Sequence, residues 1–242
     1  MAELSPMMKQ YFETKKKYPD TILMFRLGDF YEMFFDDAVT ASRELELVLT
    51  GRACGQEERA PMCGVPFHSA DSYMARLVAK GYKVAICEQM EDPALAKGLV
   101  KREVVRVLTP GTVIENSMLN EGRNNFLASV YFTGESAGVC FIDVSTGSVN
   151  LTELAAPALP DKIINEIGRF MPSEIVFNSA SSSLTKVFSF ISNKTEALAQ
   201  ELGDDYFDPQ SSAEIILKHF KKDSLSELEL NETGAAVSAL GA

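Results

Sequence analysis

The chain has 242 residues, enough for one large or two medium-sized domains, and its 46% apolar and 24% charged content is that of an ordinary globular protein. The net charge of −11 argues at first sight against DNA binding, and four cysteines without a Cys-x-x-Cys spacing beside two histidines give no zinc motif. The chain has no apolar run of the roughly 18 residues that indicate a membrane span, and it opens without a signal-peptide pattern. We therefore expect a cytoplasmic protein with reduced cysteines and no membrane partner.

The first half of the chain predicts a mixed α/β unit with a central sheet. Ser5 is the expected N-cap of the first helix, with Pro6 at its first position, and Gly81 is expected just after the last helix of this half. A polar loop is expected over residues 51–60. Helices are expected over 7–17, 36–47 and 73–80, and strands over 22–27, 82–88 and 104–108.

The second half predicts three short antiparallel strands followed by alternating helices and strands, a pattern typical of a three-layer, ribonuclease-H-like α/β domain. We set the domains at 1–112 and 126–242, with 113–125 as a linker. The helical pattern at the end has no C-cap, so we expect the chain to be cut inside an element. Strands are expected over 126–132, 138–143, 148–154 and 175–177, and helices over 161–170, 213–220 and from 232 onward.

The negative charge lies almost wholly in the second half. Residues 1–108 carry 15 Lys and Arg against 16 Asp and Glu, a net charge of −1, whereas residues 109–242 carry 8 against 18, a net charge of −10. The second half would repel a polyanion and the first half would tolerate one. Any DNA contact is therefore expected mainly from residues 1–108, with most phosphate contacts supplied by a larger protein.

The most informative segment reads Gly28-Asp29-Phe30-Tyr31-Glu32-Met33-Phe34. It follows an apolar, strand-like run, and Gly-Asp after a strand indicates a tight corner. An aromatic ring at such a corner can project outward. The alternative from spacing alone is that Phe30 is a buried core residue and Glu32 a solvated surface residue.

The whole ordered set of segments resembles the N-terminal part of the MutS family of DNA mismatch-recognition proteins. The resemblance is close over residues 5–125 and looser, though continuous, to 242. It is carried by Ser5-Pro6-Met7-Met8-Lys9-Gln10-Tyr11, Phe25 to Phe34, Leu49-Thr50-Gly51-Arg52, Pro61 to His68, Val84 to Gln89 and Val104 to Thr112.

The resemblance implies a mismatch-binding domain followed by a connector domain. Phe30 would wedge into the minor groove and stack on a mispaired base, and Glu32 would contact a base edge. The same resemblance implies further DNA contacts from Arg52, Met62, Lys101 and Arg102. Met62, Gly64, Pro66 and His68 are expected in a loop behind or beside the wedge.

The resemblance also implies partners and cofactors for the whole protein. Mismatched double-stranded DNA, a second subunit and a downstream repair protein that binds the connector domain would be the partners. No phosphate-binding loop motif Gly-x-x-x-x-Gly-Lys-Ser/Thr occurs in the chain, so we expect no ATPase and no cofactor here. ATP and Mg²⁺ would belong to the full-length protein.

Two other functions stay open. Asp143, at a strand end, could hold a metal ion for a structure-specific nuclease, provided that further carboxylates converge on it. In the alternative, Asp143 caps the turn through residues 145–147. A junction-binding MutS relative specialised for recombination is the third possibility, against which Phe30 and Glu32 both speak. The candidate partners of Asp143 are Glu174, Asp204, Asp205 and Asp208.

Overall fold

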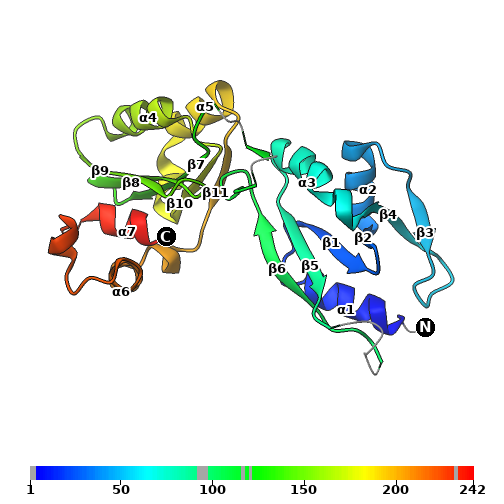
Figure 1. Ribbon diagram of the computed structural model, residues 1–242. Helices are drawn as coiled ribbons and strands as arrows, with labels where there is room; N and C mark the ends of the chain where they lie inside the picture. Colours follow the sequence, from blue (N-terminus) through cyan, green and yellow to red (C-terminus); the bar gives the residue numbers. More distant parts are fainter. Residues whose placement is uncertain (1–3, 92–97, 116–117, 120–121, 232–233) are drawn as a thin grey trace. The chain divides into compact units, whose positions relative to one another are not determined.

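A computed structural model describes all residues except 1–3, 92–97, 116–117, 120–121 and 232–233. The chain forms two compact units, Met1–Thr109 and Pro110–Ala242, which are described separately (Figure 1). Among the described residues, no helix has both the length and the apolar character that would let it cross a membrane.

The first unit is built on a six-stranded mixed sheet with the strand order β3-β4-β2-β1-β5-β6. β1 and β5 run parallel, and every other neighbouring pair is antiparallel. The strands are β1 (Ile22–Leu27), β2 (Phe30–Phe34), β3 (Thr50–Arg52), β4 (Ala60–Pro66), β5 (Val84–Gln89) and β6 (Arg102–Leu108).

Three helices cover this sheet, α1 (Pro6–Lys15), α2 (Phe35–Leu45) and α3 (Ala70–Ala79). The expected N-terminus of α1 is confirmed, since the Ser5 side chain accepts a hydrogen bond from the Met8 N–H at 3.4 Å. Tyr11 of α1 anchors this helix to the sheet, because its buried ring makes edge-on contacts with Phe25 and Phe34.

Two loop predictions in this unit are wrong. Residues 51–60 were expected to be a loop, yet the last two residues of β3 and the first residue of β4 lie within them. Met62, Gly64 and Pro66 were expected in a loop, yet they lie on β4, which pairs with β2. Proline and glycine within a short segment weaken the strand pattern, and pairing on both sides of β4 overrides that local preference.

The second unit has a five-stranded mixed sheet with the order β11-β10-β7-β8-β9. β7, β8 and β9 form the expected antiparallel meander, while β10 lies parallel to β7 and to β11. The strands are β7 (Phe126–Phe132), β8 (Ser136–Asp143), β9 (Ser148–Ala155), β10 (Glu174–Phe177) and β11 (Leu198–Glu201).

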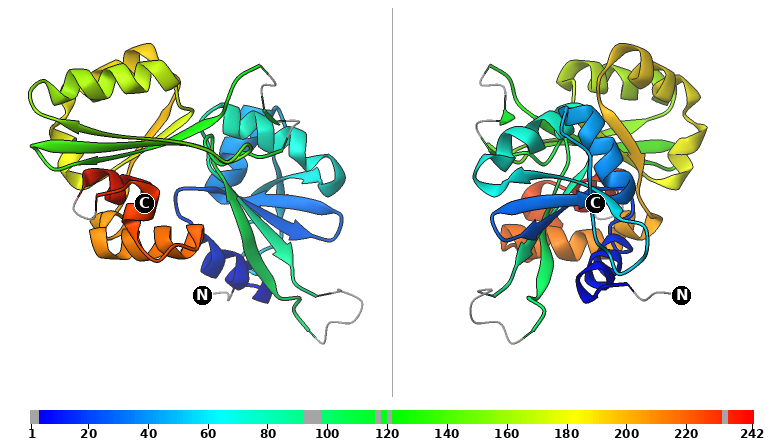
Figure 2. Two further views of the ribbon diagram at one scale, coloured as in Figure 1. Left: turned by 60° about the vertical axis from the view of Figure 1, so that its left-hand side comes forward. Right: turned by 90° about the vertical axis from the view of Figure 1, so that its right-hand side faces the viewer.

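Helices lie on both faces of this second sheet, so the unit has three layers (Figure 2). On one face, Ile163 and Ile167 of α4 and Val187 of α5 form a core with Val130 of the sheet. On the other face, the backbone of α7 approaches Gly138 so closely that a Cβ there would collide with the carbonyl oxygen of Ala235. The helices are α4 (Leu159–Phe170), α5 (Thr185–Lys194), α6 (Pro209–Phe220) and α7 (Ala235–Gly241).

The predicted α/β class is therefore confirmed for both units, each with a mixed sheet. The ribonuclease-H-like assignment of the second unit stays a prediction. The 113–125 segment, predicted as a linker, includes Asn125, whose side chain donates a 2.8 Å hydrogen bond to the Pro110 carbonyl. The N–H of Gly111 likewise donates a 3.0 Å hydrogen bond to the carboxylate of Glu174.

Candidate nucleic-acid interface

Gly28 and Asp29 form the two-residue corner between β1 and β2, and Leu27 pairs with Phe30 across it. Gly28 has a φ of +58°, a left-handed value that glycine adopts without steric cost. Glycine with positive φ at the first position of a two-residue hairpin loop is the type II′ arrangement, which fits the twist of the flanking strands. The corner expected from the sequence is thus confirmed.

Phe30, the first residue of β2, has 46% of its surface exposed. The neighbouring aromatic residues of the same strand, Tyr31 and Phe34, are buried, with only 6% and 0% of their surfaces exposed. A ring exposed to this extent contributes little to the core, so the expectation that Phe30 projects outward is met. Its contact with a mispaired base stays a prediction.

Glu32 lies two residues further along β2, on the same face of the sheet as Phe30. Its side chain is 14% exposed, and its Oε2 accepts a hydrogen bond from Nη1 of Arg52 on β3. The structure therefore brings these three predicted site residues, Phe30, Glu32 and Arg52, to one region of the sheet. The Arg52 side chain remains 38% exposed.

The strand β4 lies between β2 and β3 and contributes Met62, another predicted site residue. Met62 pairs with Phe34 of β2 and with Thr50 of β3, whose hydroxyl donates a 3.1 Å hydrogen bond to the Met62 carbonyl. Met62 packs partly buried against the core below. Gly64 pairs with Glu32, and a Cβ at Gly64 would lie 3.2 Å from the carbonyl oxygen of Tyr31, so the close approach of the two strands favours glycine there.

Lys101 lies just before β6 and Arg102 is the first residue of that strand, and the two differ sharply in exposure. The Lys101 side chain is 68% exposed and forms a 2.7 Å ion pair with Glu103, which raises the pKa of Lys101. Arg102 is only 9% exposed, and burial lowers its pKa. Its Nε donates to the Arg26 carbonyl at 2.7 Å, and its Nη1 donates to Gln10 Oε1 at 3.0 Å.

The Arg102 guanidinium thus donates its hydrogen bonds inside the protein and does not face solvent. This placement favours a structural role for Arg102, and its predicted DNA contact has no support in the geometry. Lys101 has the exposure that a phosphate contact needs. His68 lies in the short 3₁₀ turn η1 (Phe67–Ser69), and its ring lies 6.0 Å from that of Phe67.

Two residues of this region were not identified from the sequence, Arg26 and Phe67. Phe67 is 43% exposed, and the Arg26 guanidinium lies over its ring. Arg26 is a charged residue within an otherwise apolar strand, and that interruption of the pattern was the signal available in the sequence.

Asp143, the candidate metal ligand of the nuclease alternative, caps a turn as the structural alternative predicted. Its Oδ1 accepts hydrogen bonds from the Ser145 N–H at 2.9 Å and hydroxyl at 2.6 Å, and its Oδ2 accepts one from the Asn125 N–H at 3.2 Å. Burial raises the pKa of Asp143, but these hydrogen bonds outweigh it and hold the pKa below the usual Asp value.

Three of the other candidate carboxylates have partners of their own, and one of them, Glu174, near the same end of β7 as Asp143, accepts hydrogen bonds from the Gly111 N–H and from Gln200 Nε2. Glu174 is at the start of β10, whereas Asp204 bonds Ser179, just beyond the end of that strand, at 2.9 and 2.6 Å. Asp208 caps α6 by accepting a 2.8 Å hydrogen bond from the Ser211 N–H. Over the residues that the structure describes, no three His, Cys, Asp or Glu side chains are arranged to hold a metal ion.

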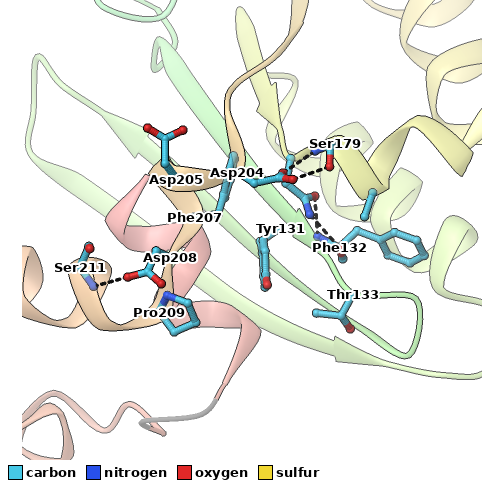
Figure 3. Close-up of a pocket in the computed structure, with 12 residues that line it drawn as sticks. Tyr131, Phe132, Thr133, Ser179, Asp204, Asp205, Phe207, Asp208, Pro209 and Ser211 are labelled. Atoms are coloured by element: carbon cyan, nitrogen blue, oxygen red, sulfur yellow. Dashed lines mark hydrogen bonds between the residues drawn. The ribbon is translucent and has the colours of Figure 1, made fainter.

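A pocket of about 800 Å³ lies at this other end of the second unit (Figure 3). Tyr131 stacks on Phe207 within it, with ring centres 5.7 Å apart. The carboxylates that line it are Asp204, Asp205 and Asp208, and two of them are already hydrogen-bonded to Ser179 and Ser211. Among the described residues that line it, none is basic.

Comparison with known families and proteins agrees with the two-unit structure. Residues 5–117 match the family model "MutS domain I", and residues 125–242 match "MutS domain II".

The chain is 51% identical over its full length to the DNA mismatch repair protein MutS of Ruminiclostridium cellulolyticum, of which it covers 27%. It is 49% identical to the MutS of Acetivibrio thermocellus over 99% of the chain and 28% of that protein. The MutS of Clostridioides difficile is 48% identical over 99% of the chain and 24% of that protein. The chain thus spans about a quarter of the length of these relatives. On the two family models together, the chain belongs to the MutS family and comprises its domains I and II.

Proposed function

We propose that the first unit recognises mispaired or unpaired bases in duplex DNA, with Phe30 as a minor-groove wedge and Glu32 as a base contact. The observation that carries this proposal is the half-exposed Phe30 ring, which stands on a two-residue hairpin corner beside a carboxylate. A wedge must be apolar, exposed and rigidly mounted, and Phe30 on paired strands has these three properties.

The energetics of a wedge favour mismatched sites. Stacking a base on an aromatic ring returns roughly 1–3 kcal/mol, while unstacking a base step costs a few kcal/mol and bending the site costs on the order of 1–6 kcal/mol. On fully paired DNA the two costs together exceed the stacking return. A mispair is already partly unstacked and more deformable, so the balance favours binding there. Recognition of this kind reads deformability rather than sequence.

Glu32 has the wrong charge for DNA, and that charge supports a role in discrimination. A carboxylate is repelled by the phosphates of any duplex, but it can accept a hydrogen bond from the base-edge donor of a displaced base. Arg52 offsets the charge of Glu32 through their ion pair, while Arg52 remains exposed enough to contact a phosphate. Glu32 would therefore add discrimination rather than affinity.

The full-length protein that carries this chain would be an ATP-dependent mismatch sensor that binds ATP and Mg²⁺ outside these two domains. A second subunit would supply further DNA contacts, because the first unit has a net charge near zero and would provide few phosphate contacts by itself. The second unit, which matches the family's domain II, would be the connector domain and would bind a downstream repair protein. These proposals rest on the family membership of the chain and on its sharing a quarter of the length of its relatives.

The test is mismatch binding by the full-length protein with Phe30→Ala. We expect matched-duplex affinity to change little and mismatch affinity to fall by about tenfold or more, the loss of one stacked base. Phe220→Ala is the matched control, because Phe220 is 42% exposed and lies on α6 of the second unit. If Phe30→Ala discriminates mismatched from matched DNA as well as Phe220→Ala does, Phe30 is not at the DNA interface.

A further inference from the structure

Arg26 contacts the Phe30 corner from the opposite face of the sheet. It pairs with Tyr31 in the β1–β2 hairpin, so its side chain lies on the face away from Phe30 and Glu32. Its guanidinium carbon is 3.7 Å from the ring centre of Phe67 and 5.4 Å from that of Tyr31. The first distance is that of a stacked cation–π contact.

The Arg26 and Phe67 pair also bonds the backbone of the corner. Arg26 Nε donates a 2.5 Å hydrogen bond to the carbonyl oxygen of Gly28, and the Phe67 N–H donates a 2.9 Å hydrogen bond to the carbonyl oxygen of Asp29. Both carbonyl groups of the two-residue turn are therefore bonded to one stacked pair of residues.

Further contacts hold Arg26 itself. Its Nη1 lies 3.8 Å from Glu88 Oε1 on β5, and the same carboxylate accepts a hydrogen bond from the Tyr31 hydroxyl. The backbone carbonyl of Arg26 accepts the 2.7 Å hydrogen bond from Arg102 on β6. Only 16% of the Arg26 side chain is exposed, so these contacts, and not solvent, surround it.

We propose that Arg26 and Phe67 are positioning residues that fix the Gly28-Asp29 corner and so present Phe30 in its DNA-binding orientation before DNA arrives. This inference rests on the proposed wedge function of Phe30. A wedge on a mobile hairpin tip would lose conformational freedom on binding, and that loss would weaken the complex. A corner whose backbone is bonded in advance avoids this loss, so the pair raises affinity without touching DNA.

Arginine and phenylalanine suit this role better than their nearest substitutes. The planar guanidinium stacks on a ring while its N–H groups donate in plane, and an ammonium group cannot do both. Arg26→Lys therefore keeps the charge and loses the geometry. Phe67→Leu keeps apolar volume and loses the aromatic face, and it changes no charge.

These two substitutions separate positioning from a charge contact. The experiment measures binding of the full-length protein to mismatched and matched duplexes at two salt concentrations, for Arg26→Lys, Phe67→Leu, the double variant of these two and Phe30→Ala. Arg26→Gln, which removes the charge, is measured alongside them. We expect each single variant to weaken mismatch binding by about fivefold, and the double variant to be no weaker than either, because both remove one stacked pair. The salt dependence should not change, because no phosphate contact is lost. Thermal unfolding of each variant reports on the fold.

Each other outcome has a defined meaning. If Phe30→Ala abolishes discrimination while Arg26→Lys and Phe67→Leu bind like the unsubstituted protein, the positioning role is refuted and the wedge stands. A uniform loss on both duplexes with a shallower salt dependence in Arg26→Gln would make Arg26 a phosphate contact instead. Unchanged discrimination in Phe30→Ala would overturn the wedge and the positioning role together. If both single variants bind less DNA only because less of the protein is folded, as thermal unfolding would show, the positioning role is also refuted.

Discussion

Arg52 on β3 donates a hydrogen bond to Oε2 of Glu32 on β2, two strands away in the sheet. Within the described part of the chain, the other oxygen of Glu32, Oε1, has no hydrogen-bond partner. The ion pair offsets the charge of the Glu32 carboxylate and engages Oε2, and a base-edge acceptor in a field of phosphates needs such an offset.

Glu32→Gln is expected to raise affinity for matched DNA by about fivefold at low salt, and to raise mismatch affinity less. The substitution removes a charge that phosphates repel, keeps a hydrogen-bonding group of the same shape, and releases Arg52. Discrimination should fall because the wrong substrate binds better. Titration of full-length protein with both duplexes at two salt concentrations checks this, and constant matched-duplex affinity would place Glu32 away from DNA.

Arg52→Gln is expected to weaken binding to matched and mismatched DNA alike, and to make the slope of log affinity against log salt shallower by about one. Both effects follow from the loss of one exposed positive charge and from the uncompensated charge of Glu32. In a protein that already carries Glu32→Gln, the loss caused by Arg52→Gln should be smaller, because no uncompensated carboxylate is left behind. Purely additive changes would show that the ion pair does not act in binding.

Phe30→Ala is expected to lower the free energy of unfolding by less than about 1.5 kcal/mol, because nearly half of the ring is already in water. Phe34→Ala, four residues further along the same strand, is the matched comparison. Phe34 is fully buried and meets Tyr11 edge-on with ring centres 5.1 Å apart, so its truncation should cost about 3–5 kcal/mol. Denaturant unfolding of both variants measures the difference, and equal losses would place Phe30 in the core.

Asp143→Asn is expected to destabilise the second unit at neutral pH and to matter less in acid. Because the folded-state pKa of Asp143 lies below its unfolded value, the ionised carboxylate stabilises the fold above the unfolded pKa. That stabilisation is lost as pH falls below about 4 and through the lower folded-state pKa. Urea unfolding of the two proteins at pH values from about 7 down to about 3 should show the gap closing, and a gap that is independent of pH would contradict the capping role.

The 242-residue chain alone is expected to bind mismatched duplex weakly at physiological salt. Its first unit is nearly neutral and its second unit is acidic, so binding releases few counterions from DNA. Fluorescence anisotropy with a labelled mismatched duplex measures this directly. Tight binding by monomeric chain would mean that the first unit provides more phosphate contacts than its charge indicates.

Local signals in the sequence determined several elements of this protein. Ser5 and Pro6 marked the start of α1, Gly28 and Asp29 marked the corner before Phe30, and Asp143 marked the turn after β8. Each of these features depends on neighbours within a few residues, so it can be predicted from the local sequence alone. The class of both units followed in the same way from the order of periodic segments.

The tertiary structure decided what depends on distant partners. β4 forms because β2 and β3 pair with its two sides, and α5, with its β-branched and aromatic residues, was not predicted at all. Arg102 is buried because Gln10, 92 residues away, and the Arg26 carbonyl accept its hydrogen bonds. The pairing of Glu32 with Arg52 and the stacking of Arg26 on Phe67 likewise join different strands and turns. Burial and hydrogen bonding between segments far apart in sequence outweigh local preference at these positions, so only the folded chain shows them.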